Sequence, residues 1–201
     1  MSTQPKTKSY ITPEEYLARE RAAEYKSEYY NGEIFAFAGA SLEHNTIVIN
    51  LVLKLAPQLR KRNCEIYSND MRVKVNATGL YTYPDVVVVC GKPQLEDDER
   101  DILLNPIVIV EVLSPSTESY DRGTKFEHYR TIDTLSDYLL VAQDKIHIEH
   151  YVRQSDRSWL FSEYKSAEEK IQIASIGCEL SVAEVYEKVE CESQSESPSK
   201  S

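Results

Sequence analysis

Two acidic residues lie in two short apolar runs of the sequence, where their type and placement suit metal-dependent chemistry. Asp85 lies near the start of residues 84–90, and Glu111 lies within residues 107–113. Both runs are short and β-branched, which predicts strands buried on both faces. A carboxylate on such a strand is costly to desolvate unless a cation or several donors meet it. Two such acids in neighbouring runs therefore suggest a shared cation.

The chemistry expected of that pair is hydrolysis of a phosphate ester. Carboxylate oxygens suit Mg²⁺ or Mn²⁺, and such an ion polarises a phosphodiester and lowers the pKa of the attacking water. The alternative is structural: Asp85 and Glu111 could each cap a turn or pair with an arginine at a strand end. From the residues alone both interpretations stay open.

Three further residues are candidates for the same site. Lys125, in the helix expected after the second acid, could place a point charge near water or phosphate, or could simply face solvent. His44, at the start of a long helix, could donate to a phosphate or act as acid or base, or could be a packing or surface group. Asp70 could assist the site, or could form a turn with Ser68 and Asn69.

Composition bounds the classes of function. The chain has 201 residues and a formal net charge of −10, which favours one domain and argues against a protein that coats nucleic acid non-specifically. A local basic groove is still compatible with that charge. Candidate contacts to a nucleic-acid backbone, which could equally be solvated faces, are Arg60, Lys61, Arg62, Arg72 and Lys74.

The compartment expected is the cytoplasm. No apolar run approaches the roughly 20 residues of a membrane span, and residues 1–10 lack the apolar segment of a secretory signal. Zinc is not expected, because the cysteines show no CxxC or Cys/His spacing, and reduced thiols are the simple interpretation. The four cysteines are Cys64, Cys90, Cys178 and Cys191.

The elements that must position these residues form one domain at residues 12–189, between a flexible tail at 1–11 and a disordered acidic, Ser-rich tail at 190–201. Thr12 and Glu15 predict a capping box that opens a helix to about residue 25. Asn31-Gly32 predicts a tight hairpin. Apolar spacing predicts a helix at 42–62, which Pro57 should kink or end early.

The remaining elements are mostly strands. Residues 71–75 alternate in a way that predicts one wet, basic face, and the charge run at 96–101 predicts a solvated loop. A helix is expected at about 122–132, and a capping box at 181–184 should open a last helix. Further strands are expected at 64–67, 137–142, 145–153 and 158–164.

With these residues considered, the sequence resembles the Uma-two family of restriction-endonuclease-like proteins in the PD-(D/E)XK nuclease superfamily. The resemblance implies an α/β protein with a restriction endonuclease-like fold, a mixed central β-sheet flanked by helices. It also implies that Asp85 and Glu111 hold Mg²⁺, helped by the carbonyl of Val112. The matching segments are Asn31-Gly32-Glu33, Gly39-Ala40-Ser41 with His44, Ser68-Asn69-Asp70-Met71-Arg72-Val73, Tyr83-Pro84-Asp85-Val86, Glu111-Val112-Leu113-Ser114-Pro115-Ser116-Thr117, and Asp121 with Lys125 and Tyr129.

One position departs from the superfamily pattern. A lysine is expected two residues after the second acid, where this chain has Leu113, and Lys125 is the candidate for a migrated lysine. The resulting prediction is a Mg²⁺-dependent endonuclease that hydrolyses DNA, with Asp85, Glu111 and Lys125 as catalytic residues in a homodimer. Two alternatives are a catalytically inactive nuclease-fold module that binds a partner or nucleic acid, and a hydrolase of a small phosphorylated metabolite.

Overall fold

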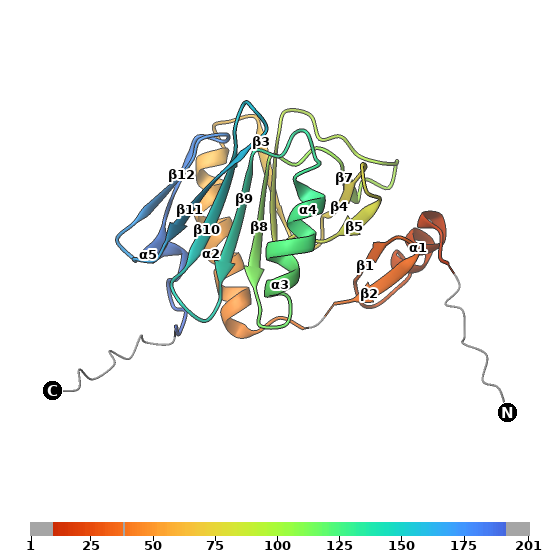
Figure 1. The fold of residues 1–201 in the computed structure, drawn as a ribbon, viewed down its shortest axis with the longest axis horizontal. Helices are drawn as coiled ribbons and strands as arrows, with labels where there is room; N and C mark the ends of the chain where they lie inside the picture. Colours follow the sequence, from red (N-terminus) through yellow and green to blue (C-terminus); the bar gives the residue numbers. More distant parts are fainter. Residues whose placement is uncertain (1–9, 38, 192–201) are drawn as a thin grey trace.

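The described residues form a mixed α/β structure. The structure is a computed structural model that describes residues 10–37 and 39–191, and the predicted tails lie almost entirely outside them. Its strands form a six-stranded sheet, a five-stranded sheet and a two-stranded ribbon (Figure 1). Helices lie against the sheets, which confirms the predicted fold class. Within the described ranges, no helix is long and apolar enough to cross a membrane.

The six-stranded sheet carries both acidic runs on neighbouring strands. Its order is β11-β10-β9-β8-β6-β3. Strand β8 runs parallel to β9, and the other neighbours are antiparallel, so the sheet is mixed as predicted. The strands are β3 (Cys64–Ser68), β6 (Val86–Cys90), β8 (Val108–Leu113), β9 (Asp137–Ala142), β10 (Ile148–Arg153) and β11 (Trp159–Tyr164).

The central strands are covered on both faces. Successive side chains of a strand point to opposite sides, so neighbouring residues pack into two different layers. Val86 and Val88 lie in an apolar layer with one long helix, α2, a ribbon of two strands and a short helix, α5. Val87 and Val89 lie in a second layer on the opposite face. The elements of the first layer are α2 (Leu42–Leu59), β12 (Lys170–Ile173), β13 (Cys178–Ser181) and α5 (Val182–Val185).

A helical crossover connects β8 to β9 on the side of the second layer. It consists of α3 (Glu118–Tyr120), a π-helical turn η1 (Asp121–Lys125) and α4 (Phe126–Tyr129). The helix therefore starts and ends earlier than predicted. Figure 1 shows this crossover and α2 on opposite sides of the sheet.

The five-stranded sheet packs over the second layer and has the order β2-β1-β5-β4-β7. Val73 and Leu80 from this sheet share the layer with Val87 of β6. The predicted strands at 64–67 and 71–75 thus belong to different sheets. The strands of this sheet are β1 (Ser27–Tyr30), β2 (Glu33–Ala36), β4 (Arg72–Val75), β5 (Leu80–Thr82) and β7 (Ile102–Leu103).

Local signals in the N-terminal region are confirmed. Helix α1 (Pro13–Glu20) begins at Thr12, whose hydroxyl accepts from the Glu15 amide while the Glu15 carboxylate accepts from the Thr12 amide. The helix ends before residue 25. Strands β1 and β2 pair through a two-residue turn, where Asn31 and Gly32 have φ values of 47° and 84°. Positive φ at both positions is what a tight hairpin turn needs.

The predicted wet, basic face of residues 71–75 is wrong. Arg72 is 4% exposed, because its face of β4 lies against α1, with the guanidinium carbon 5.7 Å from the Tyr16 ring centroid. Its Nε and Nη2 atoms donate to the Tyr83 hydroxyl at 2.9 and 2.6 Å, and its Nη1 lies 3.5 Å from Asp101 Oδ2. Lys74 is partly buried and pairs with Glu96. Alternation alone did not reveal that α1 and the loop carrying Asp101 cover this face, which is opposite to the face where Val73 and Val75 meet the six-stranded sheet.

Three smaller expectations also changed. Helix α2 ends at Leu59, three residues before the predicted end at 62, as expected from Pro57 two residues earlier. Helix α5 forms, but the Ser181 side chain makes no capping hydrogen bond. The acidic loop at 96–101 is not wholly solvated, because Arg21 donates hydrogen bonds to Asp97 and Asp101.

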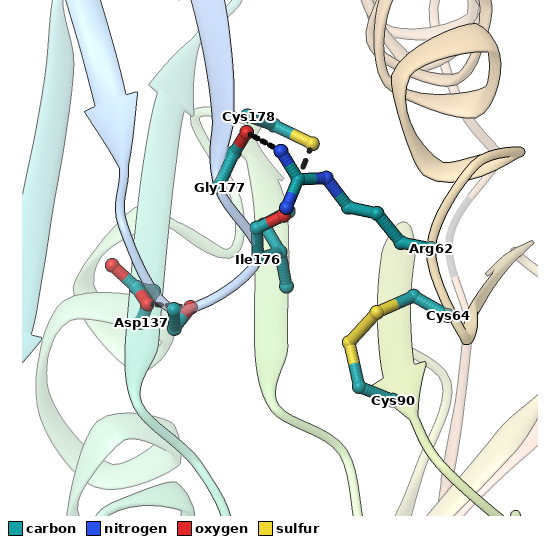
Figure 2. Close-up of a disulfide and its surroundings, with 8 residues drawn as sticks. Arg62, Cys64, Cys90, Asp137, Ile176, Gly177 and Cys178 are labelled. Atoms are coloured by element: carbon teal, nitrogen blue, oxygen red, sulfur yellow. Dashed lines mark hydrogen bonds between the residues drawn. A yellow bond between two sulfur atoms is a disulfide. The ribbon is translucent and has the colours of Figure 1, made fainter.

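The expectation of four reduced thiols is also wrong. Cys64 and Cys90 form a disulfide, and they are direct partners in the antiparallel register of β3 and β6. Figure 2 shows this disulfide near Arg62, whose guanidinium donates to the Gly177 carbonyl at 2.7 Å. The register is a long-range property, so spacing in the sequence could not indicate the pairing.

Candidate functional site

The structure brings Asp85 and Glu111 together at one end of the β6–β8 pair. Val86 faces Val110 in the antiparallel register, and one further step along the same register places Asp85 opposite Glu111. The Asp85 Oδ2 atom accepts a hydrogen bond from the Val112 amide at 2.7 Å. The two acids therefore lie close enough for the charge on one to affect the other.

Glu111 is the buried member of the pair, and only 3% of it is exposed. Its Oε1 atom accepts from the Tyr129 hydroxyl at 2.7 Å and lies 3.0 Å from Lys125 Nζ. Burial raises the pKa of Glu111 to about 8, against the opposing effect of Lys125, and the negative charges of Asp121 and Asp85 raise it further. In the described part of the chain, Glu111 Oε2 makes no hydrogen bond.

Lys125 turns inward from the π-helical turn, so the exposed alternative does not apply. Its Nζ atom lies 3.0 Å from Glu111, 3.3 Å from Glu28 and 3.4 Å from Asp121. Burial alone would lower the pKa of Lys125, but these carboxylates together with the Tyr129 phenol raise it well above its usual value. The ammonium is therefore held charged in the interior. π-helical turns are rare in proteins, and those that occur are frequently found at functional sites.

Lys125 also accounts for the departure at Leu113. Glu111 and Leu113 point to the same face of β8, because they are two residues apart on a strand. Leu113 is buried in the second apolar layer, which the crossover helix covers. The lysine from that helix thus approaches Glu111 from the face on which a lysine at position 113 would lie.

Glu28 was not anticipated from the sequence. It lies on β1 in the other sheet, is buried, and accepts from the Thr82 hydroxyl as well as contacting Lys125. The hairpin signal at residues 31–32 fixes the local register of Glu28, but nothing local indicates that this hairpin meets the crossover helix. Asp121 and Tyr129, which also contact this cluster, match the family pattern but had no expected role.

The second-rank candidates have different environments. His44 Nε2 lies 2.9 Å from Asp85 Oδ1, and the N-cap hydroxyl of Ser41 accepts from the His44 amide at 3.0 Å. Helix α2 thus positions His44 at the site. Asp70 is not positioned there: its exposed carboxylate pairs with Lys26 at 2.7 Å. The adjacent Asn69 does contact Asp85: the Asn69 backbone amide donates to the Asp85 backbone carbonyl at 3.2 Å.

The donor set fits a hard divalent cation that keeps several of its own waters. Three carboxylates, those of Glu111, Asp121 and Glu28, surround the ammonium of Lys125, and Asp85 lies opposite Glu111, which leaves negative charge uncompensated when all are ionised. Mg²⁺ is commonly bound by one or two carboxylates plus water and substrate oxygens. No group of three or more His, Cys, Asp or Glu side chains among the described residues is arranged as a metal site by itself.

Access to the buried pair is from the side of Asp85 and His44, whose side chains are partly exposed. A shallow pocket lies close by, at the ends of β8 and β9. It contains none of the acids of the site. Its lining residues are Leu113, Ser114, Pro115, Glu118, Ala142, Gln143 and Asp144.

The mixed sheet flanked by helices places the chain in the class of restriction endonuclease-like folds. A solved structure from Anabaena variabilis ATCC 29413, described as "a putative nuclease belonging to DUF820", superposes with a TM-score of 0.72. The two chains are 18% identical, and the match covers 88% of this chain and 97% of the other. At that identity the likeness shows a shared fold.

The family follows from the sequence matches. The Uma2 family model, described as "Putative restriction endonuclease", matches residues 13–183, and the chain belongs to this family. Two Synechocystis proteins are similar along most of their length. The protein sll1609 is 39% identical over 84% of this chain and 95% of its own length, and slr1290 is 37% identical over 88% and 91%. Both are described only as uncharacterized.

Proposed function

We propose that this protein is a metal-dependent endonuclease that hydrolyses phosphodiester bonds of DNA. The observation that carries the proposal is the convergence of three groups: Asp85 and Glu111 lie at facing positions, and Lys125 Nζ lies 3.0 Å from Glu111. The family's description and the nuclease-like fold agree with it. A phosphodiester is the substrate type for which paired carboxylates and a nearby ammonium are suited.

Mg²⁺ or Mn²⁺ is the proposed cofactor, and Asp85, Glu111 and the carbonyl of Val112 would hold it. When bound, such an ion polarises the phosphate and lowers the pKa of the attacking water. The protein's own groups have separate tasks. Lys125 places a fixed positive charge beside the reaction centre, where it orients water and offsets charge that develops on the phosphate.

The surrounding residues hold these groups in place. Tyr129 donates to Glu111, which orients that carboxylate. Glu28 and Asp121 hold the ammonium of Lys125 when Glu111 shares its charge with a cation. His44 contacts Asp85 from the accessible side, so its imidazole is placed to meet a phosphate oxygen.

The test is cleavage of supercoiled plasmid by the purified full-length chain. We expect Mg²⁺ to produce nicked or linear product, EDTA to stop the reaction, and Asp85→Asn, Glu111→Gln and Lys125→Met to lose at least about a hundredfold in rate. Asp156→Asn is the matched control, because Asp156 is an exposed acid in the β10–β11 turn. Equal nicking by wild type and Asp85→Asn would show that the activity comes from a contaminant.

We further propose a homodimer, because two copies of the site would let one assembly cut both strands of a plasmid where they are locally unpaired. Light scattering coupled to size-exclusion chromatography gives the mass directly. A monomer that only nicks one strand would contradict the dimer while leaving the hydrolytic proposal in place.

The rival function is a nuclease-fold module that binds but does not cut. It is favoured by one observation: both oxygens of Asp85 already contact protein groups, Oδ1 with His44 and Oδ2 with Val112. Under this rival function, Mg²⁺ and Mn²⁺ would leave the melting temperature of the protein unchanged. The protein would also cut neither plasmid nor a chromogenic phosphodiester.

A further inference from the structure

The β1–β2 hairpin turns one face towards the candidate site. Glu28 and Phe35 are direct partners in its antiparallel register. Side chains at directly opposed positions lie on the same face of a sheet. Since Glu28 contacts Lys125 at 3.3 Å, Phe35 lies on the site-facing side of the hairpin.

Phe37 extends the same face towards Asp85. It lies two residues beyond Phe35, and its amide donates to the Lys26 carbonyl, which continues the ladder by one step. Its ring packs edge-on against Tyr83, with the ring centroids 5.8 Å apart. Tyr83 precedes Asp85 by two residues, so Phe37 packs against the segment that leads into the site.

Both phenyl rings are exposed to an unusual degree for their size. Phe35 is 47% exposed and Phe37 is 45% exposed. Strand β2 is an edge strand, and among the described residues no other strand covers its outer side. Exposed apolar side chains that cluster beside a candidate site indicate a binding surface, whereas single ones need no explanation.

The charges around the site indicate what that surface binds. The basic residues proposed from the sequence as backbone contacts include Arg72, which is buried, and Arg62, whose guanidinium is bound to the Gly177 carbonyl. The net charge is −10. Gripping a duplex through its phosphates requires clustered cations, whereas stacking of an unpaired base on an aromatic ring adds affinity that does not come from the phosphates.

One cation does accompany the rings. Lys26 Nζ lies 5.6 Å from the Tyr83 ring centroid, on the hairpin residue directly across from Phe37. Lys26 Nζ also pairs with Asp70 Oδ1 at 2.7 Å, so the affinity expected of this surface comes from the rings, on which unpaired bases can stack. Bases paired inside a duplex do not expose their faces to such rings.

We propose that Phe35 and Phe37 form a stacking surface for unpaired nucleobases, and that the substrate carries single-stranded nucleotides beside the phosphate that is cut. This inference rests on the proposed nuclease function. It specifies the substrate class as single strands, flaps, loops or frayed ends rather than continuous duplex.

The test is fluorescence anisotropy with labelled oligothymidylate and a labelled duplex of equal length, in buffer containing EDTA so that no cleavage occurs. We expect the single strand to bind at least about tenfold more tightly than the duplex. Phe35→Ala and Phe37→Ala should each weaken single-strand binding roughly five- to a hundredfold, the range for loss of one base stack. Phe37→Trp should retain binding.

Phe161→Ala is the matched control. Phe161 is equally exposed, at 47%, but lies on β11 in the other sheet. The Phe161→Ala variant should bind oligothymidylate with the affinity of the wild type. Because all three phenylalanines are exposed, thermal melting of the variants should match wild type, which separates lost binding from lost folding.

Three results would overturn the inference: no single-strand binding by wild type, alanine variants that bind normally, or equal affinity for duplex. If the alanine variants instead convert a dimer to a monomer with unchanged affinity for oligothymidylate, the surface binds a second copy of the chain. Failure of the nuclease proposal is distinguishable, because it would appear as absent Mg²⁺-dependent cleavage with stacking-dependent binding intact.

Discussion

Lys125 Nζ lies 3.3 Å from Glu28 Oε1, and this contact joins the crossover helix of the six-stranded sheet to the five-stranded sheet. Glu28 also accepts from Thr82 of β5, so its carboxylate is fixed from within its own sheet. The ammonium is thereby positioned from both layers of the protein. The geometry of the candidate site depends on how the two sheets dock.

Glu28→Gln should slow cleavage about ten- to a hundredfold, because it removes a charged partner that positions the Lys125 ammonium. The Mg²⁺ concentration for half-maximal rate should change little, since Glu28 is not a proposed metal ligand. Steady-state rates across a Mg²⁺ titration give both quantities. Glu24→Gln, an exposed acid ahead of β1, is the control and should cut like wild type.

Lys125→Met should lower the free energy of unfolding at pH 8 by about 3–5 kcal/mol, because buried carboxylates at Glu111, Glu28 and Asp121 lose their cation. Guanidinium unfolding measures the change. The exposed Lys165→Met should change it by less than about 0.5 kcal/mol. A Lys125→Met protein as stable as wild type would mean that the acids are not held as a charged cluster.

Glu111 should make the metal-free protein less stable as pH rises. Its pKa is about 8 in the folded protein against 4.5 ordinarily, so between these values the folded state holds a proton that the unfolded state has lost. The contribution is complete below pH 4.5 and is lost as pH rises through about 8. Burial raises the pKa of Asp121 as well, which adds a slope of the same sign.

Glu111→Gln should therefore flatten the decline in unfolding free energy between pH 5 and pH 8, because glutamine carries no proton to lose. Lys125 keeps Glu28 and Asp121 as partners in this variant, so it is not left unpaired. Denaturant melts at a series of pH values provide the curve. Glu99→Gln, in the exposed acidic loop, should keep the wild-type slope.

Mg²⁺ or Mn²⁺ should raise the melting temperature of the wild type. At a hundred times its dissociation constant a ligand adds about 2.7 kcal/mol, which corresponds to roughly 5–10 °C for a chain of this length. Asp85→Asn should abolish the shift, and the shift should grow towards pH 8, because Glu111 then releases its proton to solvent and its carboxylate is free to bind the metal. Asp70→Asn should keep the shift, because Asp70 pairs with Lys26 outside the site.

Reduction of the Cys64–Cys90 disulfide should lower the free energy of unfolding by about 3 kcal/mol, from the loop entropy expected for a sequence separation of 26 residues. Denaturant melts with and without dithiothreitol measure it. Cys64→Ser should reproduce the reduced value. Cys191→Ser should not, because Cys191 is a free thiol; an effect of equal size there would point to some other action of the reductant.

The parts of the fold that were predictable depend on local chemistry. Thr12 with Glu15 and Asn31 with Gly32 act within a few residues, so their cap and turn were visible in the sequence. The buried acidic strands were visible because their β-branched runs are covered on both faces. Whether Lys125 points inward could not be decided from position alone.

The parts that were missed depend on how the sheets stack and align. The burial of Arg72 requires α1 to pack on β4, and the Cys64–Cys90 bond requires the register of β3 with β6. Glu28 enters the site only because β1 meets the crossover helix. Each is a contact between segments far apart in the chain, and residue type gives no signal for it.

The contact between Glu28 and Lys125 has a consequence for synthesis in the cell. A nascent chain holds Glu28 and Asp85 long before it holds Lys125, and β8 gains its parallel neighbour only when β9 has emerged. Prematurely terminated products that stop before the crossover helix lack the ammonium altogether. The complete set of proposed catalytic groups therefore assembles only late in translation.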